Sequence, residues 1–202
     1  MTSPTVSTEA VMITATIDAL EGRDVAVVDI PGAYLSADME NEVHVVFRGT
    51  LAEMMLMADP ALYRPFVSYE TGKPVLYVRI QKALYGCLKS ALLLYEKLVG
   101  DLKADGFKIN PYDPCVANKM IGGKQLTVCW HVDDLKISCV DENEVTKMKQ
   151  WLESEYGEMH GSRGKRHDYL GMWLDYSILG KVRIAMEEYL RGVLNDFPEE
   201  IK

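Results

Sequence analysis

The sequence lacks any long apolar run. Its hydrophobic stretches are short and interrupted by charged residues, whereas a membrane-spanning helix needs about 20 consecutive apolar residues. The N-terminal segment MTSPTVSTEA also lacks the basic and then apolar pattern of a secretory signal. We therefore expect an intracellular protein that makes no membrane contact.

Cysteine is scarce as well. The four cysteines, Cys87, Cys115, Cys129 and Cys139, form no Cys-x-x-Cys pair and match no zinc-ligand spacing. Three of them lie in or beside apolar runs, where a reduced cysteine packs as a small hydrophobe. The pattern argues against a disulfide scaffold and favours a reducing compartment.

Basic residues are outnumbered, because 22 Lys and Arg face 30 Asp and Glu for a net charge of −8. This argues against simple coating of nucleic acid, which needs a strongly basic surface. An acidic body can nevertheless carry a basic groove. The one local basic cluster, GSRGKRHD, holds Arg163, Lys165 and Arg166 beside His167, and we expect it to be a solvated loop.

The sequence does contain enough apolar residues and regular periodicity for a folded domain. Its 202 residues are 48% hydrophobic, which suits one domain with a sizeable core. Periodicity, capping residues and Gly or Pro breaks predict helices over residues 7–21, 50–63, 88–105, 141–157 and 187–197. The same signals predict strands at 24–30, 42–47 and 115–120, and hairpins at 66–80, 126–140 and 167–186, the last turning at Leu179-Gly180. Helices interleaved with hairpins indicate the α+β class with a largely antiparallel sheet.

Two adjacent acids stand out in LTVCWHVDDLKISCV, residues 126–140. Alternating apolar residues on both sides of Asp133 and Asp134 predict a hairpin with the acids at its bend. A turn needs only one Asp, and two adjacent carboxylates repel each other. Asp29 ends the buried run DVAVVDI, so neighbouring strands could bring all three acids together. Two Mg²⁺ ions roughly 3.5–4 Å apart would neutralise them and could promote phosphoryl transfer. The alternative is an acidic surface turn and an unrelated strand-end Asp.

Four blocks in order change the balance between these two interpretations. They are VVDIPGAYLSADMENEVHV, IQKALYGCLKSALLLYEKL, WHVDDLKI and HDYLGMWLDY. Together they resemble the reverse transcriptase domain of copia-type long-terminal-repeat retrotransposons, over nearly the whole chain. Departures from the family pattern are His131 in place of a tyrosine, and Lys89 and Ala91 in place of Gln and Pro.

The resemblance implies a set of site residues. Asp29, Asp133 and Asp134 would be the catalytic carboxylates and, with the backbone at Ile30, would contact two Mg²⁺ ions, Mn²⁺ being a possible substitute. The nucleotide would meet Tyr34, Tyr85 and Gly86, with Tyr34 under the sugar; the alternative for Tyr34 is core packing behind a turn. The primer would meet His131, Leu170, Gly171 and Met172.

The resemblance also implies an architecture and partners. Residues 1–186 would form a palm, a sheet of three or four strands backed by helices near 88–105 and 142–156. Residues 187–202 would begin a thumb or connection helix, and the fingers would be largely missing. The implied activity is RNA-directed DNA polymerisation on a primed RNA or DNA template with deoxynucleoside triphosphates. The implied setting is a retrotransposon polyprotein in the cytoplasm or a retrotransposon particle.

Two expectations limit that activity. The family's upstream basic residues, which hold the triphosphate, do not precede the first block, so we expect the chain alone to polymerise weakly or not at all. The alternative function is a non-catalytic, retroelement-derived palm retained for binding or as a relic.

Overall fold

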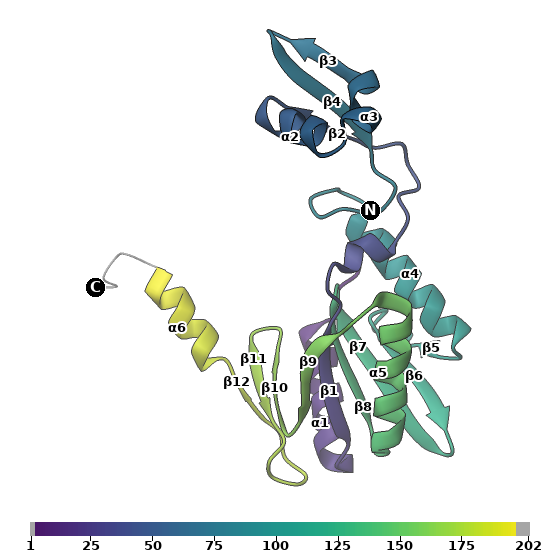
Figure 1. Cartoon of the computed structure of the whole chain (residues 1–202). Coiled ribbons are helices and arrows are strands. Elements are labelled where there is room, and N and C mark those ends of the chain that lie inside the picture. Colours follow the sequence, from purple (N-terminus) through teal and green to yellow (C-terminus); the bar gives the residue numbers. More distant parts are fainter. Residues whose placement is uncertain (1–2, 197–202) are drawn as a thin grey trace.

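The computed structural model describes residues 3–196, and a six-stranded antiparallel sheet forms its centre (Figure 1). The strand order is β5-β6-β7-β8-β1-β9. The strands are β1 Asp24–Asp29, β5 Lys108–Ile109, β6 Val116–Ile121, β7 Lys124–His131, β8 Asp134–Cys139 and β9 His160–Gly164. The expected α+β class with an antiparallel sheet is confirmed. The sheet is wider than the three or four strands expected, because β5 and β9 extend its two edges.

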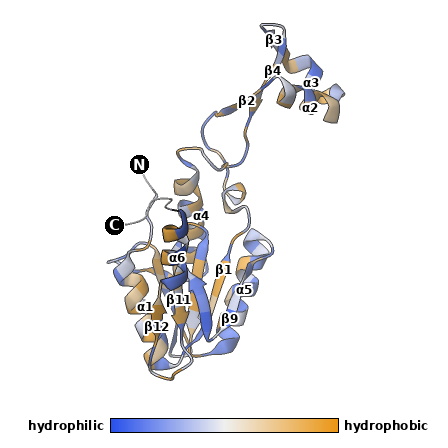
Figure 2. Cartoon of the chain, turned by 90° about the vertical axis from the view of Figure 1, so that its left-hand side faces the viewer, coloured by the Kyte–Doolittle hydropathy of each residue, from blue (hydrophilic) through white to orange (hydrophobic). Residues whose placement is uncertain are grey.

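Helices cover both faces of this sheet. The two expected backing helices, α4 (Ser90–Ala104) and α5 (Glu142–Tyr156), pack together on one face, where the Tyr156 hydroxyl donates to Asp101. Helix α1 (Thr8–Glu21) lies on the opposite face, where Lys136 pairs with Asp18. Figure 2 shows α1 and α5 on the two sides of the sheet. Neighbouring strand residues point to opposite faces, so the central strands are apolar on both sides.

A smaller unit is joined to the main sheet by two chain segments (Figure 1). Its sheet has the order β2-β4-β3, with β2 His44–Arg48, β3 Val67–Glu70 and β4 Lys73–Arg79. The helix expected over residues 50–63 breaks into α2 (Thr50–Ala58) and α3 (Pro60–Tyr63), followed by the short η2 (Arg64–Phe66). The break follows from Asp59, which caps α3, and from Pro60 in its first turn.

The chain after α5 departs most from the sequence expectations. The expected solvated loop GSRGKRHD is wrong in both halves: residues up to Gly164 belong to β9, which pairs with β1, and residues 166–168 belong to the next strand, where His167 is buried. The expected hairpin over residues 167–186 is instead a three-stranded sheet of β10 (Arg166–Tyr169), β11 (Met172–Asp175) and β12 (Arg183–Ala185). Its first turn is at Leu170-Gly171, both with positive φ, and the expected turn at Leu179-Gly180 lies in the second connection.

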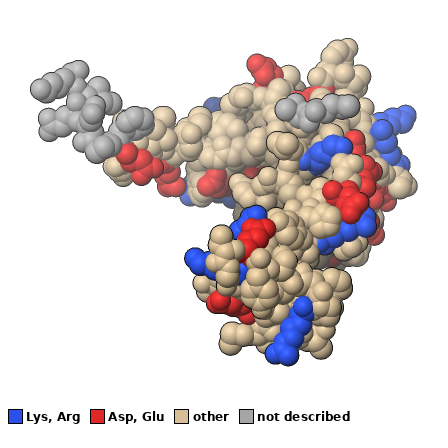
Figure 3. All heavy atoms as spheres, turned by 90° about the horizontal axis from the view of Figure 1, so that it is seen from above, with Lys and Arg blue, Asp and Glu red and all other residues tan. Residues whose placement is uncertain are grey.

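Helix α6 (Glu187–Asp196) ends the described part of the chain. The rest of the helix expected over residues 187–197, and of the thumb segment expected over 187–202, falls outside the described residues. Across residues 3–196 no helix combines the length and apolarity needed to cross a bilayer. On the face seen in Figure 3, basic and acidic side chains lie in small mixed groups and form no continuous basic stripe.

Candidate active site

Asp29 and Asp134 lie directly opposite each other in the main sheet. Asp29 is the last residue of β1 and Asp134 is the first of β8, and the register pairs them. Directly paired side chains share one face of an antiparallel sheet, with Cβ atoms roughly 4.5–5.5 Å apart. The pairing therefore places side by side two carboxylates that are 105 residues apart in the sequence.

Both carboxyl groups have raised pKa values. Burial is the main cause of the raised pKa of Asp29, and repulsion by Asp133 adds to it. The pKa of Asp134 is raised by burial, then by Asp133 and Asp29. Since charge repulsion of this kind needs short distances, the three acids form one electrostatic cluster.

The hairpin between β7 and β8 turns through Val132 and Asp133. His131 and Asp134 are the last paired residues, so the bend contains one of the two acids and Asp134 begins the next strand. Val132 has φ 58°, which is strained for a β-branched residue. The carbonyl of Asp133 accepts a hydrogen bond of 3.1 Å from the N–H of Ile30, which fixes the turn against the end of β1.

Two histidines extend the acid pair into a row across the sheet. His160 on β9 pairs with Asp29, and His131 on β7 pairs with Asp134. The row His160, Asp29, Asp134, His131 thus runs over four neighbouring strands on one face. His160 was missed in the sequence because its strand has no apolar alternation.

Two of the predicted nucleotide residues come together beside Asp133. Tyr34 lies in the short helix η1 (Ala33–Ser36), and its ring centroid is 5.9 Å from that of Tyr85. Burial raises the pKa of Tyr34, and the charge of Asp133 raises it further. Tyr34 also packs against the hydrophobic core, so the packing alternative describes part of its surroundings. Gly86 follows Tyr85 with φ 90°.

Ile30 directly follows β1, and the predicted primer residues Leu170, Gly171 and Met172 lie in the β10–β11 hairpin. The Ile30 carbonyl accepts from Ala33 N–H, and its own N–H is engaged by Asp133. Leu170 and Gly171 form the β10–β11 turn, and Met172 begins β11. This hairpin is tied to the main sheet because the buried Tyr169 hydroxyl donates to the Cys129 carbonyl at 3.2 Å.

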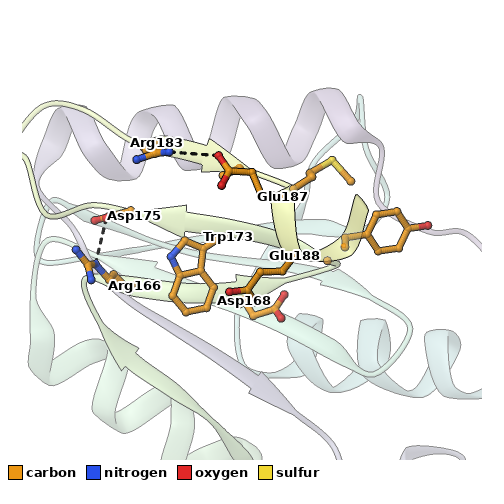
Figure 4. Close-up of a pocket in the computed structure, with 11 residues that line it drawn as sticks. Arg166, Asp168, Trp173, Asp175, Arg183, Glu187 and Glu188 are labelled. Carbon is orange, nitrogen blue, oxygen red and sulfur yellow. Dashed lines mark hydrogen bonds and ion pairs between the residues drawn. The ribbon is translucent and has the colours of Figure 1, made fainter. Parts of the chain in front are cut away.

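A pocket of about 400 Å³ opens at the acids and contains both Asp29 and Asp134. Its far wall is formed by Arg166, Asp168 and Trp173 on the β10–β11 hairpin. The same three residues line a second pocket of about 460 Å³ that reaches Gly171 and α6 (Figure 4). The pocket at the acids and the pocket at Gly171, a predicted primer residue, are therefore neighbours that share three lining residues. The sequence analysis missed Trp173 and Asp168 as lining residues.

The donor set suits a hard dication. Among residues 3–196 no group of three or more His, Cys, Asp and Glu is disposed around one metal position. Mg²⁺ needs fewer, because it is commonly held by one or two carboxylates together with waters and substrate phosphates. The paired Asp29 and Asp134, with Asp133 in the adjoining turn, supply such carboxylates.

Comparison with known families assigns the chain. The family described as reverse transcriptase (RNA-dependent DNA polymerase) matches residues 1–199. The chain therefore belongs to the reverse transcriptase family. Membership carries the general function of RNA-directed DNA synthesis from nucleotide substrates on a nucleic-acid template. A search of curated proteins returns no significant match.

Proposed function

We propose that the chain is the polymerase domain of a copia-type retrotransposon and extends a primer by two-metal nucleotidyl transfer. The observation that carries this proposal is the cross-strand pairing of Asp29 with Asp134 beside the Asp133 turn. The four sequence blocks that resemble the copia-type domain support the finer assignment. The partners would be a primed RNA or DNA template, deoxynucleoside triphosphates and the rest of the polyprotein.

The three carboxylates would hold two Mg²⁺ ions, or Mn²⁺ in their place. Bound ions of this kind stabilise the charge that develops on the attacking and leaving oxygens of a phosphoryl transfer. Asp29 and Asp133 would be the principal ligands and Asp134 a more peripheral one. The protein contributes position: the Ile30–Asp133 hydrogen bond holds the turn against β1, so the acids keep one arrangement.

The substrates would approach from two sides of the acids. Tyr34, supported by the ring of Tyr85, would lie under the sugar of the incoming nucleotide and disfavour a 2′-hydroxyl. The Leu170–Met172 turn and the pocket that contains Gly171 would receive the primer end. Trp173 lines that pocket and offers an aromatic face, and stacking of this kind is worth about 1–3 kcal/mol per base.

Primer extension with Mg²⁺ or Mn²⁺ tests the proposal. Asp29→Asn and Asp133→Asn should each abolish extension without loss of fold, because each removes a metal ligand. Asp105→Asn is the matched control, since Asp105 pairs with Lys119 away from these acids. Retained extension by either site variant would refute the assignment.

The competing proposal is a non-catalytic palm. The observation that favours it is the net charge of −8, which opposes binding of a negatively charged triphosphate beside three carboxylates. It predicts template binding without extension in either metal, even at high nucleotide concentration. It also predicts that Asp29→Asn leaves template affinity unchanged.

A further inference from the structure

A serine–histidine pair joins two neighbouring strands and takes no part in the proposed mechanism. Ser162 lies on the edge strand β9, and His167 lies on β10. The Oγ of Ser162 is 2.8 Å from Nδ1 of His167. A hydroxyl within hydrogen-bond reach of an imidazole is the usual arrangement of an activated serine nucleophile. The pair lies in the segment GSRGKRHD, to which the proposed polymerase assigns no chemistry.

The partner of the second ring nitrogen fixes the direction of this hydrogen bond. Nε2 of His167 lies 3.0 Å from the carbonyl oxygen of Gly164, and a carbonyl oxygen can only accept. In the neutral ring Nε2 therefore carries the hydrogen and Nδ1 carries the lone pair. The Ser162 hydroxyl consequently donates to Nδ1. A base that a third group holds in one orientation completes the arrangement.

Burial keeps the His167 ring in the neutral form that a base requires. The residue is 1% exposed. Burial is the main cause of its lowered pKa, which the hydrogen bond to Gly164 opposes. The charge of Lys136 lowers the pKa further, whereas Asp24 and Asp18 raise it. Because the net shift is downward, the ring is uncharged at neutral pH and Nδ1 can take a proton.

The serine is exposed, unlike its histidine partner, and it faces a pocket large enough for a small substrate. Ser162 lines the pocket of about 400 Å³ that also contains Asp29 and Asp134. These two carboxylates repel an anionic substrate. Trp173 lines the same pocket and offers an apolar, aromatic surface. The pocket therefore favours a neutral substrate with an apolar or aromatic group.

We propose that Ser162 is a nucleophile that accepts an acyl group from neutral carboxylic esters, with His167 as its general base. The Ser162 Oγ bonds to the carbonyl carbon while its proton moves to Nδ1 of His167. The bond between the carbonyl carbon and the ester oxygen then breaks, and the leaving oxygen takes the proton from Nδ1. The products are acyl-Ser162 and an alcohol, so the step needs no metal and no co-reactant.

Arg166 can stabilise the negative charge that develops on the carbonyl oxygen. Its guanidinium lines the same pocket, and the bond from its Nε to Asp175 uses one of its five N–H donors. Donors that are aimed at a developing oxyanion lower the barrier to acyl transfer.

Incubation of the chain with p-nitrophenyl acetate in EDTA tests the proposal. We expect a burst of p-nitrophenol stoichiometric with the chain. After an acid quench, peptide mass spectrometry should find the acetyl group on Ser162. Ser162→Ala, a change at an exposed position, should lose both signals. Because EDTA removes metal ions, the result does not depend on whether the chain polymerises.

His167→Asn separates the base from the hydrogen bond. The amide oxygen of asparagine can accept from the Ser162 hydroxyl but cannot take its proton. The rate of acetylation should therefore fall by about 10²-fold or more, since general base catalysis typically contributes 10²–10⁴-fold. Circular dichroism checks that the variant folds. If it does not fold, Ser162→Ala and the peptide map of the unchanged chain still decide the outcome.

Ser154 is the matched control within the same chain. It is also exposed, but its hydroxyl donates to the carbonyl of Trp151 at 2.7 Å rather than to an imidazole. We expect Ser154 to stay unmodified. Equal acetylation of Ser154 and Ser162, a burst that survives Ser162→Ala, or an unchanged rate in folded His167→Asn would overturn the proposal. The Ser162–His167 bond would then only link β9 to β10.

Discussion

The negative charge of Asp134 lowers the stability of the folded chain, whereas a neutral side chain at this position would not. Its pKa is raised by burial and by repulsion from Asp133 and Asp29. A raised carboxyl pKa means that the folded chain binds the proton more tightly than the unfolded chain does. The contribution to stability is therefore present at low pH and is lost as pH rises through the folded pKa.

Asp134→Asn should consequently raise the Tm at pH 7. The increase should shrink as the pH falls below the usual carboxyl range, where Asp134 is protonated in both states. In a chain of this size each 1 kcal/mol corresponds to roughly 2–4 °C. Calorimetric Tm values between pH 3 and 8, in metal-free buffer, measure the effect.

Asp141→Asn is the control of opposite sign. A hydrogen bond from Lys124 lowers the pKa of Asp141, and Asp141 also caps α5. Its stabilisation is present at neutral pH and is lost as pH falls through the lowered pKa, so this substitution should reduce the Tm at pH 7. A lower Tm for Asp134→Asn at pH 7 would contradict the repulsion argument.

Gly161 is required by the close approach of β9 to β1. A Cβ at this position would lie 2.1 Å from the carbonyl oxygen of Val27 and 2.8 Å from Cα of Val28. Backbone atoms cannot yield as a flexible side chain can, so Gly161→Ala should separate the two strands and move His160 from Asp29. We expect strong destabilisation, measured as a lowered Tm and faster amide exchange in β9.

Gly100→Ala provides the matched comparison. Gly100 lies within α4, is exposed, and a Cβ there would meet nothing within 4 Å. Replacing glycine by alanine in a helix interior should stabilise by about 1 kcal/mol. If Gly161→Ala were equally stabilising, the close approach of β9 would be wrong.

The individual acids were predictable, whereas their neighbours were not. Asp29 and Asp133 each follow an apolar run that predicts a strand. The four family-like sequence blocks, in their order, support their assignment as site residues. His160 sits in HGSRG, which has no apolar residue, and its pairing depends on the backbone of β1. Such an edge strand has no side-chain signal, because hydrogen bonds to its neighbour define it.

At the scale of elements, α1 is attached to the sheet by a buried ion pair. Lys136 on β8 bonds Asp18 on α1, and their side chains are 0% and 1% exposed. Removing one partner of such a pair typically costs about 3–5 kcal/mol, because the other charge stays buried and unpaired. Lys136→Met should therefore lower the Tm steeply in thermal unfolding.

The double variant Asp18→Leu/Lys136→Met separates pairing from charge burial. Replacing both charges by apolar residues of similar size is often neutral or stabilising. We expect the double variant to recover most of the stability lost by Lys136→Met. A double variant as unstable as the single one would show that α1 depends on the ionic contact itself.

Elements with strong local signals were predicted well, and elements decided by tertiary pairing were not. Helix α5 follows from Asp141 as its cap and Gly157 after its last residue, as the sequence predicts. The β10–β12 sheet was predicted as one hairpin because Leu170-Gly171 resembles strand sequence. There Leu170 adopts φ 56°, a conformation that its own propensity does not favour.

At the scale of the whole molecule, the chain has two packing units of unequal size. The main hydrophobic clusters contain no buried residue between 44 and 79. Within that span the buried hydrophobic residues are Ala52, Val75 and Leu76. The β2–β4–β3 unit therefore has only a small hydrophobic core of its own. It adds no buried residue to the core of the main sheet, so we expect the main sheet to fold without it.

The connection between the two units is itself a short antiparallel ladder. Ile80 N–H donates to the Val43 carbonyl at 3.0 Å, and Met39 N–H donates to the Gln81 carbonyl at 2.9 Å. Lys82 and Asp38 form an ion pair beside these bonds at 2.6 Å. Because Val43 and Ile80 are already hydrogen-bonded partners, a two-residue Asn-Gly turn can join them in the manner of a hairpin.

Replacing residues 44–79 by Asn-Gly should therefore leave the main sheet folded. The six-stranded sheet, its three covering helices and the acid row all lie outside the excised span, so the shortened chain should unfold cooperatively within a few degrees of the intact one. Circular dichroism and calorimetry measure this. The matched control replaces the same span by a single Gly, which is too short to turn between Val43 and Ile80. It should destabilise the antiparallel ladder that connects the two units. If the Asn-Gly chain instead failed to fold, the small unit would be an integral part of the main core.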